Sequence, residues 1–141
     1  MHRKKEVHTK EVSVAAPPSA AAAGTLYLVA TPIGNLQDLS ARAMSILRAV
    51  NLIGCEDTRH SRTLLDHYVI GTKTVSYHDH NERERAVEFG DRLLAGESIA
   101  IISDAGMPGI ADPGYRIVAE AIARNITIVP IPGAVALTSA L

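Results

Sequence analysis

The chain has 141 residues, of which 47% are apolar and 21% charged, and its formal net charge is −1. This length and composition suit one globular domain, and the near-neutral charge excludes a protein whose whole surface attracts nucleic acid. A nucleic-acid site would therefore have to be local. The single cysteine, Cys55, excludes an internal disulfide and is expected to be a small buried apolar residue. No apolar stretch approaches the ~20 residues of a membrane span, and we expect a cytoplasmic protein.

Residues 1–23 predict a disordered N-terminal extension. Basic residues precede an alanine-rich stretch, as in a signal peptide, but Glu6 and the Pro17-Pro18 pair leave no hydrophobic segment of the required kind. We therefore place a single α/β domain at residues 24–141. Its last segment, Ala134–Leu141, predicts the first turns of a helix without a stop signal, which indicates a truncated chain.

From residue 25 onward, short apolar runs alternate with segments whose apolar residues recur every three or four positions. Strands are expected at Thr25–Ala30, Leu52–Cys55, Lys73–Tyr77, Ile99–Ile102 and Ile126–Ile131. Helices are expected at Leu39–Val50, Arg62–Tyr68, Glu82–Ala95 and Tyr115–Arg124, with another opening after Pro132-Gly133. This order predicts a mostly parallel five-stranded sheet with helices on both faces.

Two of the predicted helices carry further signals. Ser40 or Asp38 is the expected N-cap of the first helix. The third helix is expected to end at Gly96. The residues of this third helix that are expected to face inward are Ala86, Val87, Phe89, Leu93 and Leu94.

A polar or glycine-rich segment follows each predicted strand. The carboxyl ends of parallel strands share one edge of a sheet, so these segments are expected to converge on one crevice. They are Thr31–Asn35, Glu56–His60, His78–Glu82, Ser103–Gly114 and Pro130–Ala134. The fourth is the most informative, because twelve residues exceed the usual βα connection of about 2–6 residues. Its glycines allow close backbone approach and its prolines fix its shape, which favours a ligand-binding loop over a plain connector.

The other segments leave alternatives open. Thr31–Asn35 is either a phosphate cradle or a Pro-Gly turn, and it lacks the lysine of a P-loop. His78 and His80 are expected to point the same way, and with a carboxylate such as Asp57 they could hold a metal ion. We favour hydrogen bonds to loops and solvent, and no metal.

Arg59 and Arg62 open the second helix and fit an RNA phosphate, because the guanidinium fork matches phosphate oxygens. The alternative for both residues is a solvated helix start.

Taken together, the motifs resemble those of the ribosomal RNA small subunit methyltransferase I family, within the tetrapyrrole methylase superfamily. They occur in the family's order and spacing over roughly residues 24–141. The segments that carry the resemblance are Thr31–Leu36 with Asp38, Arg42-Ala43, Glu56–Arg59, His78–Glu82, Ser103–Gly106, Asp112–Gly114 and Pro132-Gly133.

The resemblance implies S-adenosyl-L-methionine as methyl donor and the ribose 2′-hydroxyl of a cytidine in 16S rRNA of the small ribosomal subunit as acceptor. It implies a homodimer and a cofactor cleft between two α/β domains, of which the second is missing from this chain. Met107 stands where the family usually has threonine. The cofactor-binding residues that the resemblance implies are Asp104, Ala105, Gly106, Met107, Ile110 and Asp112, with Pro132 and Gly133.

Methyl transfer requires the hydroxyl oxygen, the methyl carbon and the sulfur in line, and a base lowers the barrier by taking the hydroxyl proton. We expect Asp57 or His78 to be that base and Arg59 to position a phosphate. Asn81 and Glu82 are expected to orient this network. The alternatives are a small-molecule, tetrapyrrole-type methyltransferase and a non-catalytic fragment that binds cofactor or RNA.

Overall fold

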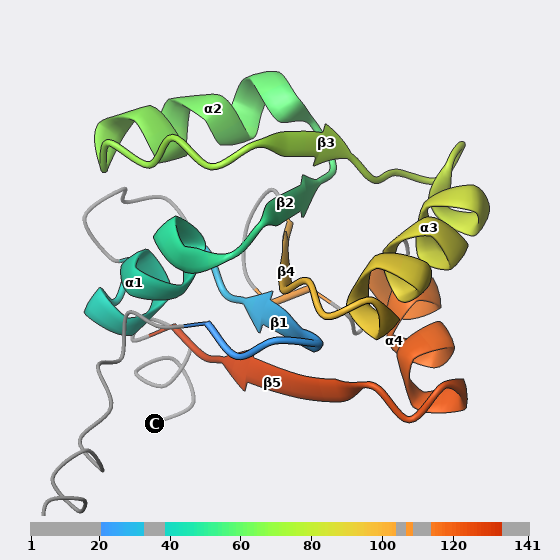
Figure 1. The fold of residues 1–141 in the computed structure, drawn as a ribbon. Coiled ribbons are helices and arrows are strands. Elements are labelled where there is room, and N and C mark those ends of the chain that lie inside the picture. The colour runs from blue at the N-terminus through green and yellow to red at the C-terminus, as the bar shows by residue number, and fades with distance from the viewer. Residues whose placement is uncertain (1–20, 33–38, 104–106, 109–113, 134–141) are drawn as a thin grey trace, which may run out of the picture.

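The computed structural model describes residues 21–32, 39–103, 107–108 and 114–133, in which strands and helices alternate (Figure 1). The strands are β1 (Thr25–Val29), β2 (Leu52–Cys55), β3 (Thr74–Ser76), β4 (Ile99–Ile102) and β5 (Thr127–Ile131). The helices are α1 (Ala41–Ala49), α2 (Thr58–His67), α3 (Glu82–Leu94) and α4 (Gly114–Ala123). The helix expected after Gly133 lies outside the described residues.

The five strands form one sheet in the order β3-β2-β4-β1-β5, and every pair of neighbours is parallel. The central strand β4 sets the register, since Ile99 pairs with Leu26 of β1 and with Leu52 of β2. The predicted fold class is confirmed.

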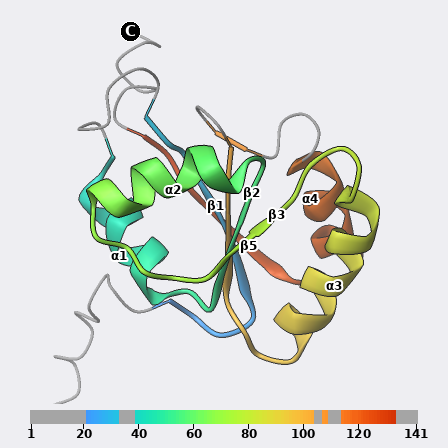
Figure 2. The ribbon, with the colours of Figure 1, turned by 90° about the horizontal axis from the view of Figure 1, so that it is seen from above.

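Three layers are visible in Figure 2, where α1 and α2 cover one face of the sheet and α3 and α4 cover the other. The strand order explains this arrangement. The chain moves from β1 through β2 to β3 in one direction across the sheet, and returns to β4 and β5 in the opposite direction. Because parallel crossovers are right-handed, a reversal of direction places the second pair of helices on the opposite face.

Each face of the sheet has its own apolar core. Tyr27, Leu47 and Cys55 belong to the core beneath α1 and α2, whereas Leu26 and Phe89 belong to the core beneath α3 and α4. Adjacent residues of β1 thus enter opposite cores, as strand geometry requires. Every residue of β2 and β4 is buried, which is typical of parallel strands covered on both sides. Cys55 is fully buried, as predicted.

The inward assignment of Val87 and Leu94 on α3 is wrong. Their exposed fractions are 45% and 60%, whereas Ala86, Phe89 and Leu93 are buried as predicted. The buried positions of α3 recur at spacings of three and four and form one narrow stripe. Val87 and Leu94 each lie one position beyond that stripe and face away from the sheet.

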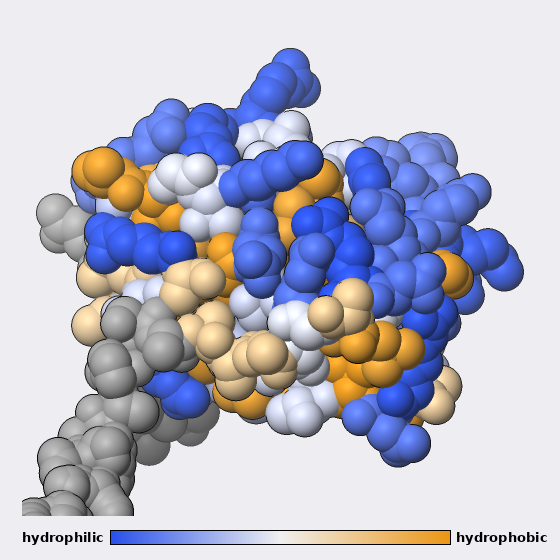
Figure 3. All heavy atoms as spheres, viewed as in Figure 1, coloured by the Kyte–Doolittle hydropathy of each residue, from blue (hydrophilic) through white to orange (hydrophobic). Residues whose placement is uncertain are grey.

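Helix α2 begins at Thr58, four residues before the predicted start, while the N-cap of α1 is Ser40, one of the two predicted caps. Hydrophilic residues dominate the face drawn in Figure 3 over α2 and α3. Among the helices that the structure describes, none is both long and apolar enough to cross a membrane.

Candidate active site

The sheet has a topological switch point at β4. The connections that leave β1 and β2 lead to α1 and α2 on one face, whereas the connection that leaves β4, between these two strands, leads to α4 on the other face. In open α/β sheets, neighbouring connections that part in this way leave a crevice where ligands bind. Two of the segments expected to converge are joined directly beyond β1 and β4, where the Thr31 hydroxyl donates to the Ser103 carbonyl at 3.2 Å.

A pocket of about 130 Å³ lies at this place. It is bounded by the residues that follow β1 and β4 and by one side of the first two turns of α2. The lining residues are Thr31, Pro32, His60, Ser61, Thr63, Leu64 and Ser103. The carboxyl edge of the sheet therefore carries a real cavity, which we name the Ser61 pocket.

Most of the expected cofactor-binding residues lie outside the described part of the chain: Asp104, Ala105, Gly106, Ile110 and Asp112. The described members lie beyond the ends of β4 and β5. Met107 is half-buried and packs against the core beneath α3 and α4. Pro132 is exposed, and Gly133 lies beside Ala30 at the end of β1. The contact of these three residues with a cofactor stays a prediction.

Asp57 is the N-cap of α2. One carboxylate oxygen, Oδ1, accepts the backbone N–H of Arg59 at 2.9 Å and that of His60 at 3.5 Å. The hydrogen bond from Arg59 lowers the pKa of Asp57 below its ordinary value, because it stabilises the ionised form. Asp57 is therefore an ionised, half-exposed carboxylate at neutral pH. Its cap also explains why α2 starts earlier than predicted.

His78 and Asp57 follow neighbouring strands of the sheet, β3 and β2. Cys55 of β2 pairs with Ser76 of β3, so Asp57 and His78 each follow their strand by two residues at the same edge. The two strand ends stay joined beyond this pair, where the Tyr77 N–H donates to the Cys55 carbonyl at 2.7 Å.

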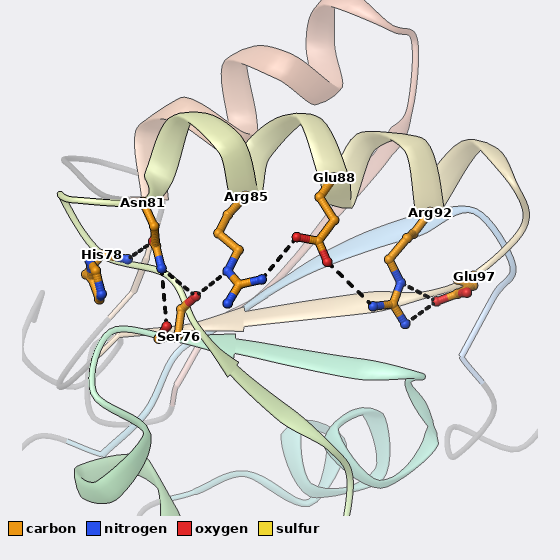
Figure 4. A network of polar contacts seen from close by, with 7 residues as sticks. All are labelled: Ser76, His78, Asn81, Arg85, Glu88, Arg92 and Glu97. Atoms are coloured by element: carbon orange, nitrogen blue, oxygen red, sulfur yellow. Dashed lines mark hydrogen bonds and ion pairs between the residues drawn. The ribbon is translucent and has the colours of Figure 1, made fainter.

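The turn that carries His78 is held by Asn81 (Figure 4). The His78 backbone N–H donates to Asn81 Oδ1 at 2.9 Å, and Asn81 Nδ2 donates to the Ser76 carbonyl and hydroxyl. Arg85 adds a hydrogen bond to the same carbonyl at 2.9 Å. The network continues along α3 through Glu88 to Arg92 and Glu97. This arrangement supports the expected orienting role of Asn81.

The histidine rings of this turn are neighbours, with centroids 5.7 Å apart. The backbone N–H of His80 donates to Nδ1 of His78 at 3.2 Å. A ring nitrogen that accepts a hydrogen bond carries no proton, so neutral His78 holds its proton on Nε2. In this arrangement His78 offers a hydrogen-bond donor at Nε2.

The two arginines of α2 have different surroundings. Arg59 is 92% exposed and lies 3.8 Å from Asp57, which leaves its guanidinium accessible to a phosphate. Arg62 donates to the carbonyls of Ile70 and Thr72 and lies 3.4 Å from Asp66. These contacts hold Arg62 against the connection from α2 to β3, and its binding of a phosphate stays a prediction.

No group of three or more histidine, cysteine, aspartate or glutamate side chains that could hold a metal ion occurs among the described residues. Glu82 contributes in another way. It is buried at the start of α3 and pairs with Arg116 of α4 at 3.5 Å. Glu82 thus joins the two helices on the face opposite to α2.

Sequence reasoning missed Ser61. It is 2% exposed and lines the pocket, one helical turn after Asp57. Its position gives a usable signal, because Ser61, Leu64 and Leu65 follow the spacing of an inward-facing helical stripe. A serine within such an apolar stripe predicts a hydroxyl group that is buried.

The family follows from comparison with known proteins. Residues 25–141 match the family described as Tetrapyrrole (Corrin/Porphyrin) Methylases. This match covers most of the chain. The chain belongs to the tetrapyrrole methylase family. The switch-point crevice therefore lies in a domain of this family.

Curated relatives in this family carry the name ribosomal RNA small subunit methyltransferase I. The chain is 55% identical over 118 residues to the one from Synechocystis sp., with 84% of this chain and 42% of the relative covered. It is 54% identical over 119 residues to the one from Pseudomonas aeruginosa, again with 84% and 42% covered. The chain thus spans about two fifths of the length of the curated relatives it matches.

A solved structure of a conserved hypothetical protein from Aeropyrum pernix K1 has the same fold. The TM-score is 0.59 at 18% sequence identity, with 80% of this chain and 39% of that chain covered. This similarity supports the fold alone.

Proposed function

We propose that the protein transfers the methyl group of S-adenosyl-L-methionine to the 2′-hydroxyl of a cytidine in 16S rRNA. The observation that carries the proposal is the identity of more than half of the aligned residues to relatives named ribosomal RNA small subunit methyltransferase I. The crevice at the switch point supports it, since Thr31 and Ser103, which begin two of the motifs that resemble that family, are joined at this edge of the sheet.

The described surroundings fit the proposed cofactor. When bound, S-adenosyl-L-methionine supplies an electrophilic methyl group on a sulfonium. The described residues beyond β4 and β5 include the half-buried thioether of Met107 and, at Gly133, a residue without a side chain. We propose that the residues from Asp104 to Asp112, together with Pro132 and Gly133, hold this molecule.

The polar residues beyond β2 and β3 are proposed to bind the acceptor nucleotide. Arg59, exposed at the start of α2, binds a phosphate. Asp57 accepts the proton of the 2′-hydroxyl, because it is ionised at neutral pH and half exposed. His78 donates from Nε2 to an oxygen of the nucleotide, which suits its present hydrogen bonding better than the role of base.

The test is methyl transfer to small ribosomal subunits that lack the modification. The protein as its gene encodes it is incubated with S-adenosyl-L-methionine labelled in the methyl group, and the RNA is then hydrolysed in alkali. Alkaline cleavage needs a free 2′-hydroxyl, so the expected result is label in an alkali-resistant dinucleotide that begins with cytidine.

Other outcomes would contradict the proposal. Label in a base instead of the ribose would refute the 2′-hydroxyl as acceptor. Transfer to a tetrapyrrole and not to RNA would favour a small-molecule methyltransferase. Calorimetric binding of the cofactor without transfer to either acceptor would indicate a binding protein. A Gly106→Val variant serves as the cofactor-site control and is expected to lose cofactor binding.

A further inference from the structure

The Ser61 hydroxyl has an unusual environment. Within the described ranges, three buried side-chain atoms have no hydrogen-bond partner: Ser61 Oγ, Glu82 Oε1 and Arg116 Nε. Glu82 and Arg116 belong to one ion pair, so their charges compensate each other. Ser61 is neutral and has no such compensation. An unsatisfied buried hydroxyl costs free energy, and in native proteins it calls for an explanation such as a ligand.

The Ser61 hydroxyl could form a hydrogen bond within its own helix, but it does not. A serine inside a helix often donates to the carbonyl four residues earlier, which here belongs to Asp57. That carbonyl accepts the Ser61 backbone N–H at 3.0 Å, and the hydroxyl makes no bond to it. The side chain instead lines the pocket at the switch point.

The lining of the pocket is rich in residues that carry hydroxyl groups. Thr31, Ser61, Thr63 and Ser103 are of this kind, Pro32 and Leu64 contribute apolar surface, and His60 adds one imidazole, while neither lysine nor arginine is among the described lining residues. A phosphate would need a cation or several N–H donors, whereas a sugar presents hydroxyls together with apolar C–H groups. The volume of about 130 Å³ equals that of about four waters at ~30 Å³ each, which suits a small ring.

We propose that the Ser61 pocket binds a ribose of the RNA substrate, with the Ser61 hydroxyl hydrogen-bonded to a ribose hydroxyl. This inference rests on the proposed function. Ser61 lies one helical turn after Asp57 and two residues after the exposed Arg59, so the pocket is near the residues proposed to bind the acceptor nucleotide. Because the 2′-hydroxyl distinguishes RNA from DNA, Ser61 would contribute to the selection of RNA.

The test compares two buried serines in the protein as its gene encodes it. Ser61→Ala removes a hydroxyl without a partner, so the melting temperature is expected to stay the same or rise. The KM for unmethylated small subunits is expected to rise about three- to tenfold with little change in kcat, as for the loss of one neutral hydrogen bond. Ser98→Ala is the matched control, because Ser98 is 5% exposed but its hydroxyl lies 3.2 Å from Asn51 Oδ1 at the far edge of the sheet. It is expected to lower the melting temperature and leave KM unchanged.

Two further measurements separate the possible failures. Ser61→Cys fills the space of the hydroxyl with a somewhat larger thiol that hydrogen-bonds poorly, so it is expected to behave like Ser61→Ala. A return to wild-type KM would show that filling the space is enough and would overturn the proposal. The affinity for small subunits is also measured directly in the absence of cofactor. This comparison of wild type and Ser61→Ala is possible even if no methyl group is transferred. Absence of transfer by the wild-type protein refutes the proposed function, whereas equal RNA affinity and KM for both proteins refutes the role of Ser61. A loss of cofactor affinity in Ser61→Ala with unchanged RNA affinity would assign the pocket to the cofactor instead.

Discussion

Asp57 combines two roles in one carboxylate. Its Oδ1 accepts backbone N–H groups at the start of α2, and its charge is available at the edge where the acceptor is proposed to bind. A single substitution that removes the carboxylate cannot separate these roles, because the cap and the charge would be lost together.

Two variants of Asp57 separate these roles. Asparagine caps helices about as well as aspartate, so Asp57→Asn is expected to keep the stability of the protein near neutral pH while methyl transfer falls by roughly 10²-fold or more, the usual size of a general-base contribution. Asp57→Ala is expected to lose both activity and stability. Thermal unfolding and transfer rates measured side by side check this expectation, and full activity in Asp57→Asn would remove Asp57 from the role of base.

The lowered pKa of Asp57 gives a pH dependence with a definite sign. The folded protein holds this proton less tightly than the unfolded chain, so the ionised cap stabilises the fold above the ordinary aspartate pKa of about 4. This contribution is lost as the pH falls through the lower, folded-state pKa. Asparagine at this position does not titrate, so the unfolding free energy of the wild type is expected to fall relative to that of Asp57→Asn between neutral pH and strongly acidic pH. A wild type that gains stability relative to the variant on acidification would contradict the assigned direction.

At the scale of the elements, three helices end in the same way. Each closes with a left-handed residue followed by a backbone bond that spans six residues, the Schellman motif. The left-handed residues are Val69 after α2, Gly96 after α3 and Asn125 after α4, with φ of 55°, 102° and 58°. The spanning bonds run from Ile70 to Leu65, from Glu97 to Arg92 and from Ile126 to Ala121. Glycine and asparagine tolerate this conformation, whereas a β-branched valine is strained in it.

We expect Val69→Gly to stabilise the protein by about 1 kcal/mol. Val69 is 84% exposed, so the substitution removes backbone strain without uncovering buried apolar surface. Denaturant unfolding provides the measurement, and Asn125→Gly is the matched control because it replaces a residue that already tolerates the same φ. A loss of stability in Val69→Gly would mean that the valine side chain makes a contact that outweighs its strain.

At the scale of the whole molecule, Gly54 is a point where α3 packs closely on the sheet. It lies in β2 between β3 and β4, and a Cβ added there would lie 2.7 Å from Ile101 Cδ1 and 3.0 Å from the Phe89 ring. The absence of a side chain thus lets α3 approach the sheet. This approach positions the start of α3, with Asn81 and the His78 turn, at the carboxyl edge.

Gly54→Ala is expected to destabilise the protein by about 1–3 kcal/mol through overpacking. Gly71→Ala is the control, since no atom lies within 4 Å of the added Cβ, and it is expected to be neutral or to stabilise the protein by up to ~1 kcal/mol. Chemical denaturation of both variants checks the contrast. Equal stabilities would show that Ile101 and Phe89 can move aside without cost.

The sequence by itself predicted the sheet, its helices on both faces and the edge at which the polar segments meet. It did so because apolar periodicity and strand-ending glycines and prolines are local signals, and the edge follows from parallel pairing alone. The early start of α2 was missed, since Thr58–Ser61 has no apolar periodicity and only the cap at Asp57 identifies it.

Only the tertiary structure decided which polar residues share a site. The strand order makes β4 the switch point, and packing encloses Ser61 beside Thr31 and Ser103. These outcomes depend on segments that are far apart in the chain, and local residue patterns do not encode which of them become neighbours.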